Sequence, residues 1–393
     1  MPKRPEVARF RKQLLAWFRQ FQRDLPWRRD KDPYRVWLSE IMLQQTRVAA
    51  VIPYYERFLE RFPDVRALAE APQEEVLRLW SGLGYYSRAR NLQKAAREIV
   101  AKHGGTFPAS LGDALALPGI GTYTAAAILS IAYGEEFAAL DGNVARVLAR
   151  LGAIRGDLRE PKRWQMLQEK ADFLLEGESP GDWNQAMMEL GATLCTPRSP
   201  QCLLCPMADC CEARKLGIAD VLPERRRKRE AVAIVLAAAV FVDAKGRTLL
   251  LAPPTREKGA NSASAAGHVP TLVSKMWHFP MVSVNENAAQ ELDRYVSSLL
   301  GKSAPRLNLE PTGKVRHAVT YRDITIFPFR ISCRTLPRIA EAGALPLSNL
   351  SSVAISNLTR KVAASVLAEA KSAPQPAHKA TAPIVRAASA GNP

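Results

Sequence analysis

Four cysteines lie close together in one short stretch of the sequence. Cys195, Cys202, Cys205 and Cys211 follow the pattern C-x6-C-x2-C-x5-C. Their soft thiolates suit a tetrahedral metal centre, which could be zinc or an iron-sulfur cluster. Zinc ribbons usually carry two separated C-x2-C pairs, whereas this stretch has one such pair flanked by single cysteines, and this favours a 4Fe-4S cluster. Cys210 is adjacent to Cys211, so chemistry alone leaves the identity of the last ligand open.

A turn with two glycines precedes an alanine-rich segment that we expect to be helical. The turn spans residues 117–121 and the segment spans residues 122–132. Gly119 and Gly121 allow close approach of a backbone whose free N–H groups, together with the helix dipole, point at an anion. The pattern predicts a phosphate-binding hairpin, although a Pro-Gly turn before any helix has a similar composition.

Two carboxylates occupy segments in which they could perform acid-base chemistry. Asp141 opens a helical segment as its N-cap, and Glu40 lies among large apolar residues of the block 37–46. A helix cap and a surface charge are the ordinary roles of such residues. If Glu40 faces a closed cleft, desolvation raises its pKa and keeps it protonated as a general acid. Cleavage of an N-glycosidic bond needs such a pair, because one group protonates the departing base and the other stabilises the positive charge on the sugar.

The length and the net charge of the chain indicate its domain number and the class of its partner. A chain of 393 residues favours two domains. The net charge of +17, from 55 basic and 38 acidic residues, favours a polyanionic partner such as nucleic acid over a merely basic surface. The sequence shows no signal peptide and no apolar run of membrane-spanning length, so we expect a cytosolic protein with no membrane partner.

Hydrophobic periodicity places these residues in a mainly α protein. Residues 7–211 repeat apolar positions at helical spacing, while 231–242, 248–251 and 315–330 have strand character. The prediction is an all-helical domain at 6–222 that includes the cysteine loop 195–211, a basic linker at 223–230, a smaller α+β domain at 231–370 and a disordered tail at 371–393.

These segments resemble the helix-hairpin-helix glycosylases of the endonuclease III superfamily, and within it the MutY family of adenine DNA glycosylases. The resemblance covers residues 7–211 and is carried by the blocks 25–28, 37–46, 82–91, 117–121, 141–146 and the cysteine loop. It implies a helix-hairpin-helix glycosylase fold with a 4Fe-4S cluster, and it assigns Cys211 as the last ligand.

The resemblance also implies catalytic roles. Glu40 would protonate N7 of adenine, Asp141 would stabilise an oxocarbenium ion or a covalent intermediate, and Asn143 would orient the carboxylates. Tyr123 stands where bifunctional relatives have a lysine. Because a phenol cannot form the Schiff base that leads to strand cleavage, we expect removal of a base without cleavage of the strand.

Other positions match residues that contact DNA in the family. Gln45 and Tyr85 match side chains that enter the base stack after a nucleotide is extruded. Trp27, Arg28 and Gln185 match the adenine pocket. Further predicted DNA contacts from the matching blocks are Thr46, Leu83, Arg88, Gly119 and Gly121. The expected partner is double-stranded DNA with an A:8-oxoguanine or A:G mispair, bound by a monomer.

The second domain resembles the Nudix-like C-terminal domain of the MutY family, which recognises 8-oxoguanine. Blocks 277–280 and 316–320 carry this similarity. The Nudix box G-x5-E-x7-R-E-x2-E-E is missing between residues 249 and 295, so pyrophosphate cleavage is not expected. Thr320 lies in Val-Thr-Tyr, where many family members have Phe-Ser-His, and it keeps only the hydroxyl of that pattern.

The sequence therefore predicts a monofunctional adenine DNA glycosylase of base excision repair. Two alternatives stay open at this point. A thymine glycosylase for G:T mismatches can share the cluster and a tyrosine at the lysine position. A non-catalytic iron-sulfur protein could use the hairpin and the cluster only to bind DNA.

Overall fold

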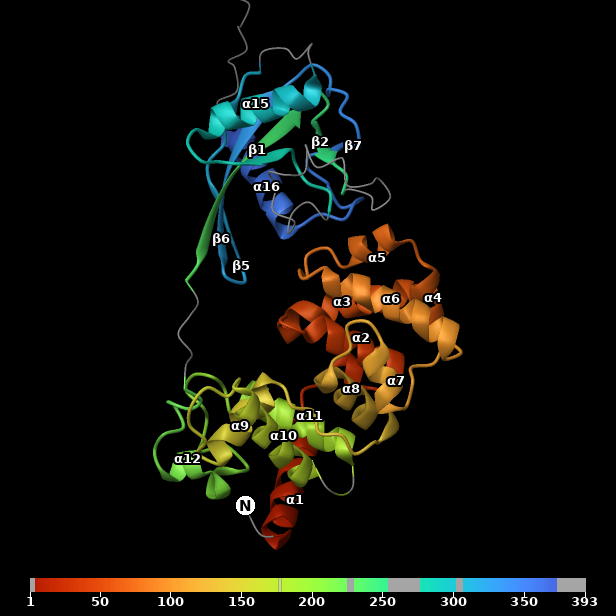
Figure 1. Cartoon of the computed structure of the whole chain (residues 1–393), viewed down its shortest axis with the longest axis vertical. Helices are drawn as coiled ribbons and strands as arrows, with labels where there is room; N and C mark the ends of the chain where they lie inside the picture. The colour runs from red at the N-terminus through yellow and green to blue at the C-terminus, as the bar shows by residue number, and fades with distance from the viewer. Residues whose placement is uncertain are drawn as a thin grey trace, which may run out of the picture. The chain divides into compact units, whose positions relative to one another are not determined.

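The structure, a computed structural model, describes residues 4–175, 177, 179–224, 230–253, 276–301 and 307–372. The chain divides into two compact units (Figure 1). The first unit contains residues 1–230 and 351–357, and the second contains residues 231–350 and 358–393. Residues 225–229 of the predicted basic linker and 373–393 of the predicted tail lie outside the described residues.

The first unit is built from helices, many of which begin at a residue suited to cap them. Asp32 accepts a hydrogen bond from the Arg35 amide at the start of α2, and Asp64 caps α4 in the same way. The helices are α1 (Arg4–Phe21), η1 (Pro26–Arg28), α2 (Pro33–Leu43), α3 (Val48–Arg61), α4 (Val65–Glu70), α5 (Gln73–Leu79), α6 (Ser87–Lys102), α7 (Leu111–Ala116), α8 (Thr122–Ile128), η2 (Leu129–Tyr133), α9 (Gly142–Leu151), α10 (Pro161–Leu175), α11 (Pro180–Thr193), η3 (Ala208–Cys210) and α12 (Glu212–Lys215).

Two apolar clusters form the core of the first unit. One joins α2 to α8 around Trp37, Phe58 and Trp80, whose side chains are fully buried. The other joins α1 to α9, α10 and α11 around Phe18 and Trp183. Burial of such large aromatic side chains is the dominant favourable contribution to folding. The two clusters hold α2 and the start of α9 in fixed positions, and these segments carry Glu40 and Asp141.

The second unit is an α+β structure. Its main sheet has the strand order β3-β1-β6-β4, with β5 also paired to β6, and β2 and β7 form a separate antiparallel ribbon. The elements are β1 (Val232–Val242), β2 (Arg247–Leu251), β3 (Met281–Ser283), α15 (Ala288–Leu300), β4 (Glu310–Pro311), β5 (Val315–Val319), β6 (Arg322–Ser332), β7 (Ala342–Pro346) and α16 (Asn357–Ser372).

Pairing and packing in the second unit follow its hydrophobic pattern. The β1 and β6 strands run parallel, with Leu236 opposite Ile326 in the register. Helix α15 covers β1 and β3 with Leu292 and Val296, which are fully buried against Phe241. The predicted fold class, a mainly α protein with a smaller α+β part, is confirmed. Among the helices of the described ranges, none has the length and apolar character that are needed to cross a membrane.

Candidate active site

A cleft in the first unit brings together most of the residues that the sequence singled out. Its empty volume is about 1570 Å³. It is lined by residues from η1, α2, α8, α11 and the start of α9. The predicted site residues among them are Trp27, Arg28, Glu40, Gln45, Thr46, Tyr123, Asp141, Asn143 and Gln185. Segments that are distant in the sequence therefore meet at one surface.

Glu40 lies on α2 with only 7% of its surface exposed. The Tyr123 hydroxyl donates a hydrogen bond of 2.8 Å to its Oε2 atom, and the same hydroxyl lies 3.2 Å from the sulfur of Met188. Burial raises the pKa of Glu40 to about 7, with a smaller contribution from the charge of Asp141, while the Tyr123 hydrogen bond opposes the shift. This carboxyl group can therefore carry a proton near neutral pH.

Asp141 is the N-cap of α9, as the sequence predicts, and it also faces the cleft. Its Oδ1 atom accepts hydrogen bonds from the backbone amides of Asn143 and Val144 at 2.9 and 2.7 Å. Its Oδ2 atom accepts one from the Asn143 side chain at 2.9 Å. Burial raises the pKa of Asp141, and these three donors oppose that rise because they stabilise the carboxylate. The two carboxyl groups therefore have different surroundings.

Asn143 is held in place by an arginine that also contacts the cysteine loop. Its Oδ1 atom accepts a hydrogen bond of 3.0 Å from Arg146 Nη2. Arg146 also donates from Nε to the Cys195 carbonyl oxygen at 2.8 Å and from Nη2 to the Gly191 carbonyl oxygen at 2.7 Å. An unbroken series of hydrogen bonds thus connects the Asp141 carboxylate to the backbone of Cys195.

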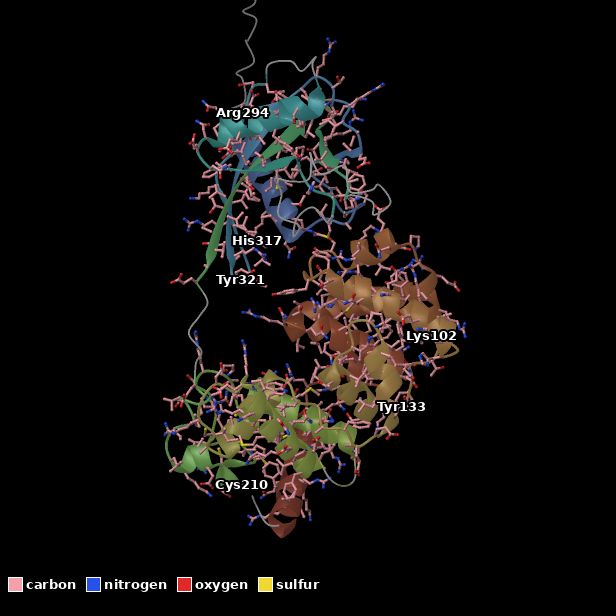
Figure 2. All side chains as sticks on the ribbon, in the orientation of Figure 1. Lys102, Tyr133, Cys210, Arg294, His317 and Tyr321 are labelled. Carbon is pink, nitrogen blue, oxygen red and sulfur yellow. The ribbon has the colours of Figure 1, made fainter. Side chains whose placement is uncertain are left out.

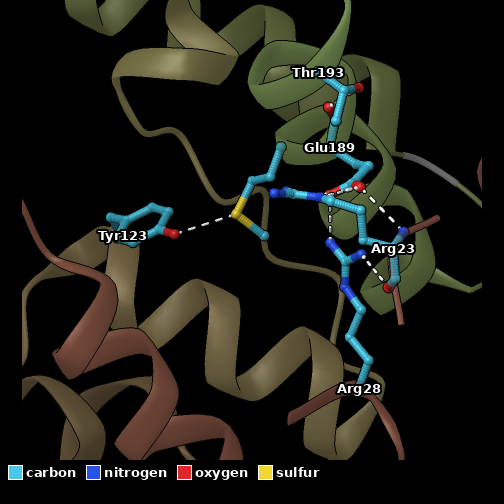
Figure 3. A network of polar contacts seen from close by, with 6 residues as sticks. Arg23, Arg28, Tyr123, Glu189 and Thr193 are labelled. Atoms are coloured by element: carbon cyan, nitrogen blue, oxygen red, sulfur yellow. Dashed lines mark hydrogen bonds and ion pairs between the residues drawn. The ribbon is translucent and has the colours of Figure 1, made fainter. Parts of the chain in front are cut away.

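Glu189 is a site residue that the sequence interpretation missed. It is 1% exposed, and Figure 3 shows Arg23 and Arg28 both bonded to its carboxylate. Its oxygens accept hydrogen bonds of 2.7 Å from Arg23 and 2.9 Å from Arg28. Burial alone would raise the pKa of Glu189, but the hydrogen bonds and charges of these arginines lower it to about 2. The spacing of Gln185, Met188 and Glu189 on α11 was the available signal, because it places all three on one helix face.

Gln45 and Tyr85 share an uncommon backbone conformation. Their φ angles are +57° and +48°, in the left-handed region that residues other than glycine rarely adopt. Both line another, smaller cavity together with Gly119. Strain of this kind persists only where the surrounding structure enforces it, and it is frequent at functional sites.

Arg88 on α6 connects the segments that carry these two residues. It donates hydrogen bonds to the carbonyl oxygens of Ile41 and Met42 at 2.9 Å, to the Thr46 hydroxyl at 3.1 Å and to the Gly84 carbonyl oxygen at 3.2 Å. Burial lowers the pKa of Arg88 to about 10. Arg88 and Leu83, two predicted DNA contacts, thus have buried side chains in this structure.

The glycines of the predicted phosphate-binding hairpin differ from each other. Gly119 has a φ of +82°, and a Cβ atom there would lie 2.9 Å from Asn91 Cβ, so only glycine fits. Gly121 has a φ of −105° and is the N-cap of α8. A Cβ atom at Gly121 would meet open space, which leaves room for another molecule to approach this backbone.

The four predicted metal ligands line one small cavity. Cys210, labelled in Figure 2, is exposed and borders a different cavity. Burial raises the pKa of Cys205 to about 12, so its thiolate needs a nearby cation. A metal centre would supply that charge, and the soft donor set fits an iron-sulfur cluster. Within the described ranges, no three or more His, Cys, Asp or Glu side chains are grouped so that they could hold a single metal ion.

Thr320 belongs to the second unit, in the turn between β5 and β6. Its φ is +55°, and its hydroxyl donates a hydrogen bond of 2.7 Å to the Val319 carbonyl oxygen. The next residue, Tyr321, is partly exposed at the same hairpin, where Figure 2 labels it together with His317.

Comparison with known proteins agrees with this geometry. Residues 38–171 match the model of the HhH-GPD superfamily of base excision DNA repair proteins. The chain is 35% identical over 404 residues to mouse adenine DNA glycosylase, an alignment that covers 91% of this chain and 78% of the mouse protein. It is 49% identical over 219 residues to the human enzyme of the same name, covering 53% of this chain and 40% of the human protein.

One of the solved structures that the chain resembles is named for a different base. A thermostable thymine-DNA glycosylase superimposes with a TM-score of 0.50 and 29% identity, covering 54% of this chain and 98% of that one. The length of this match is therefore close to that of the helical unit alone. The mouse alignment covers nearly the whole of this chain at 35% identity, and on this basis the chain belongs to the adenine DNA glycosylase family of the HhH-GPD superfamily.

Proposed function

We propose that the chain is a monofunctional DNA glycosylase that hydrolyses the N-glycosidic bond of adenine mispaired with 8-oxoguanine or guanine. The observation that carries this proposal is the pair of carboxyl groups in one cleft, Glu40, which is buried, and Asp141, which is half-buried. Their surroundings differ, and a difference of this kind separates the acid from the stabilising anion in glycosidic bond cleavage.

Glu40 acts as the general acid. With a pKa of about 7 it is partly protonated at neutral pH, and it transfers its proton to N7 of the departing adenine. Protonation turns the base into a neutral leaving group as the bond from its N9 to the sugar breaks. Removal of a general acid typically slows such a step by about 100- to 10,000-fold.

Asp141 acts as the anion that stabilises the cationic sugar. The amides of Asn143 and Val144 and the Asn143 side chain donate to it, and donors of this kind favour the charged form. The carboxylate stabilises the oxocarbenium ion or adds to it covalently. Water then completes hydrolysis and leaves an abasic site.

Tyr123 limits the enzyme to base removal. It lies in the cleft with its hydroxyl on Glu40, at the position where bifunctional relatives have a lysine. A phenol has no amine with which to form a Schiff base to the sugar, so the strand stays intact after the base leaves.

The remaining cleft residues bind the extruded base and its strand. Arg28 and Gln185 offer polar contacts to the adenine edge, Glu189 holds Arg28 in place, and Trp27 supplies an apolar wall. Gln45 and Tyr85 enter the base stack. A second group of residues holds the backbone that approaches DNA, namely Thr46, Leu83, Arg88, Gly119 and Gly121.

A 4Fe-4S cluster is bound by Cys195, Cys202, Cys205 and Cys211. The shared cavity and the need for positive charge beside buried thiols support this assignment. When bound, the cluster would hold together the loop between α11 and α12 and could exchange an electron. The second unit, as a Nudix-like domain at 231–370, recognises 8-oxoguanine opposite adenine, with the Thr320 hydroxyl at its β5–β6 hairpin.

A cleavage panel tests this function. Purified full-length protein is incubated with duplexes that contain A:8-oxoguanine, A:G or T:G, and alkali then converts abasic sites into strand breaks. We expect breaks only after alkali and only at adenine, and loss of activity in Glu40→Gln and Asp141→Asn. Product from T:G alone would contradict the proposed base, whereas breaks without alkali would contradict the monofunctional mechanism. Full activity in both variants would contradict the assigned roles.

A further inference from the structure

Arg150 is a fully buried arginine beside the four cysteines. It lies in the last turn of α9 and is 1% exposed. Its Nε atom donates to the Leu222 carbonyl oxygen at 2.9 Å, and Nη1 donates to the Thr196 carbonyl oxygen at 2.7 Å and to Cys195 Sγ at 3.3 Å. These partners are two carbonyl groups and one thiol.

One nitrogen of this guanidinium has no partner. Arg150 Nη2 is buried and makes no hydrogen bond in the described structure. A buried donor left without an acceptor costs about 1 to 3 kcal/mol, and more when the group is charged. Arg150 also lines the cavity that the four thiols line. The missing acceptor is therefore expected in that cavity.

The positive charge of Arg150 also needs a counter-charge, which we expect in the same cavity. An arginine side chain is a cation, and among the described residues no carboxylate forms an ion pair with Arg150. Arg214, which lines the same cavity, instead lies 3.7 Å from Asp209 and is 37% exposed. A buried charge without a counter-charge is strongly unfavourable. An anionic iron-sulfur centre with four thiolate ligands would supply both the counter-charge and the sulfur acceptor.

We propose that Arg150 binds the iron-sulfur centre directly, with Nη2 donating to one of its sulfur atoms while Nη1 keeps its contact with Cys195 Sγ. This inference rests on the proposed cofactor. Hydrogen bonds to cluster sulfurs and nearby positive charge stabilise the reduced, more negative state. Arg150 therefore sets the reduction potential of the centre as well as its retention, and through Leu222 it connects the centre to the end of the helical unit.

The test uses the full chain and three variants. Arg150→Lys keeps the charge and loses the forked donors, Arg150→Met loses both, and Arg214→Met is the matched control from the same cavity. Iron, zinc and acid-labile sulfide are counted per chain, and the reduction potential is measured on DNA-free protein. We expect Arg150→Lys to shift the potential negatively by at least about 59 mV, a tenfold weaker preference for the reduced state in a one-electron couple.

Three results would decide the matter. Arg150→Met should lose iron and sulfide during gel filtration, whereas Arg214→Met should keep both and the wild-type potential. An unchanged potential and full cluster content in Arg150→Lys would overturn the proposal, even if Arg150→Met does not fold. Wild-type protein with zinc and no sulfide would overturn it too, independently of adenine release. If the variants show the expected shifts while the wild-type protein releases no adenine, the result would instead contradict the proposed function alone.

Discussion

At the scale of single residues, polar groups of the candidate site combine a structural role with a catalytic one. Asp141 caps α9 and faces the cleft with the same carboxylate, and Tyr123 uses one hydroxyl toward Glu40. The cap was predictable because it depends on neighbouring amides. The pair formed by Glu189 and Arg28 was not, because its members are 161 residues apart in the chain. Local chemistry is encoded within a few positions, whereas such a pair depends on the completed fold.

Substitution of Tyr123 by Phe should move the alkaline limit of activity upward. The phenol donates to Glu40 and lowers its pKa from the value that burial alone would give. Without this hydrogen bond the carboxyl group keeps its proton to a higher pH. The protonated general acid, and with it the activity, therefore persists to a higher pH. The kcat/KM profile for adenine release, which reports the free enzyme, would show this shift. A profile that moves to lower pH would contradict it.

Substitution of Glu189 by Gln should destabilise the protein by about 3 to 5 kcal/mol, since two guanidinium groups would lose their buried counter-charge. Urea unfolding would measure this loss, and Asp182→Asn on the same helix is the control because its ion pair with Arg19 is longer, at 3.6 Å, and partly exposed. The pKa of Glu189 is lowered from 4.5 to about 2 in the folded state. Its contribution is thus complete above about pH 4.5 and disappears as the pH falls toward 2. Equal losses in the two variants would contradict this role.

At the scale of helices and turns, the cleft depends on segments held by backbone acceptors. Hydrophobic periodicity predicted the helices of the first unit and the strand near 231–242, since an element's own pattern determines its buried face. The strand-like stretch 315–330 is two strands, β5 and β6, joined by a turn at Thr320 and Tyr321. The function of Arg88 required the structure. Its acceptors lie at the end of α2, more than 40 positions earlier in the chain, as well as in the adjacent turn.

Substitution of Arg88 by Met should lower kcat/KM for adenine release by about 100-fold. The arginine holds the segments that carry Gln45 and Tyr85, and a displacement of about 1 Å can produce a loss of that size. Arg97→Met is the control, because Arg97 lies on the same helix but donates to the Ala69 carbonyl oxygen. Single-turnover cleavage of an A:8-oxoguanine duplex measures both variants. Similar rates in the two variants would show that Arg88 has no special effect on the site.

At the scale of the whole chain, residues 351–357 belong to the first unit although they follow all the strands of the second unit in the sequence. The buried Ile355 carbonyl oxygen accepts hydrogen bonds from the Ser81 hydroxyl at 2.8 Å and from the Tyr86 hydroxyl at 3.0 Å. The Asn357 side chain donates to the Gly82 carbonyl oxygen at 3.0 Å. No local sequence pattern predicted this return, because the partners of Ile355 lie 274 and 269 positions earlier in the chain.

The double variant Ser81→Ala/Tyr86→Phe should release this segment. Both hydroxyl donors to the buried Ile355 carbonyl would be lost, which costs about 1 to 3 kcal/mol. Hydrogen exchange of the full chain, followed by mass spectrometry, should show faster exchange over residues 351–357. Tyr54→Phe is the control, because its hydroxyl bonds to the Ser81 carbonyl oxygen and not to Ile355. Since Tyr85 lies in the turn that the segment contacts, the double variant should also bind mismatched duplexes more weakly. Unchanged exchange together with unchanged binding would exclude a role for the segment in holding this turn.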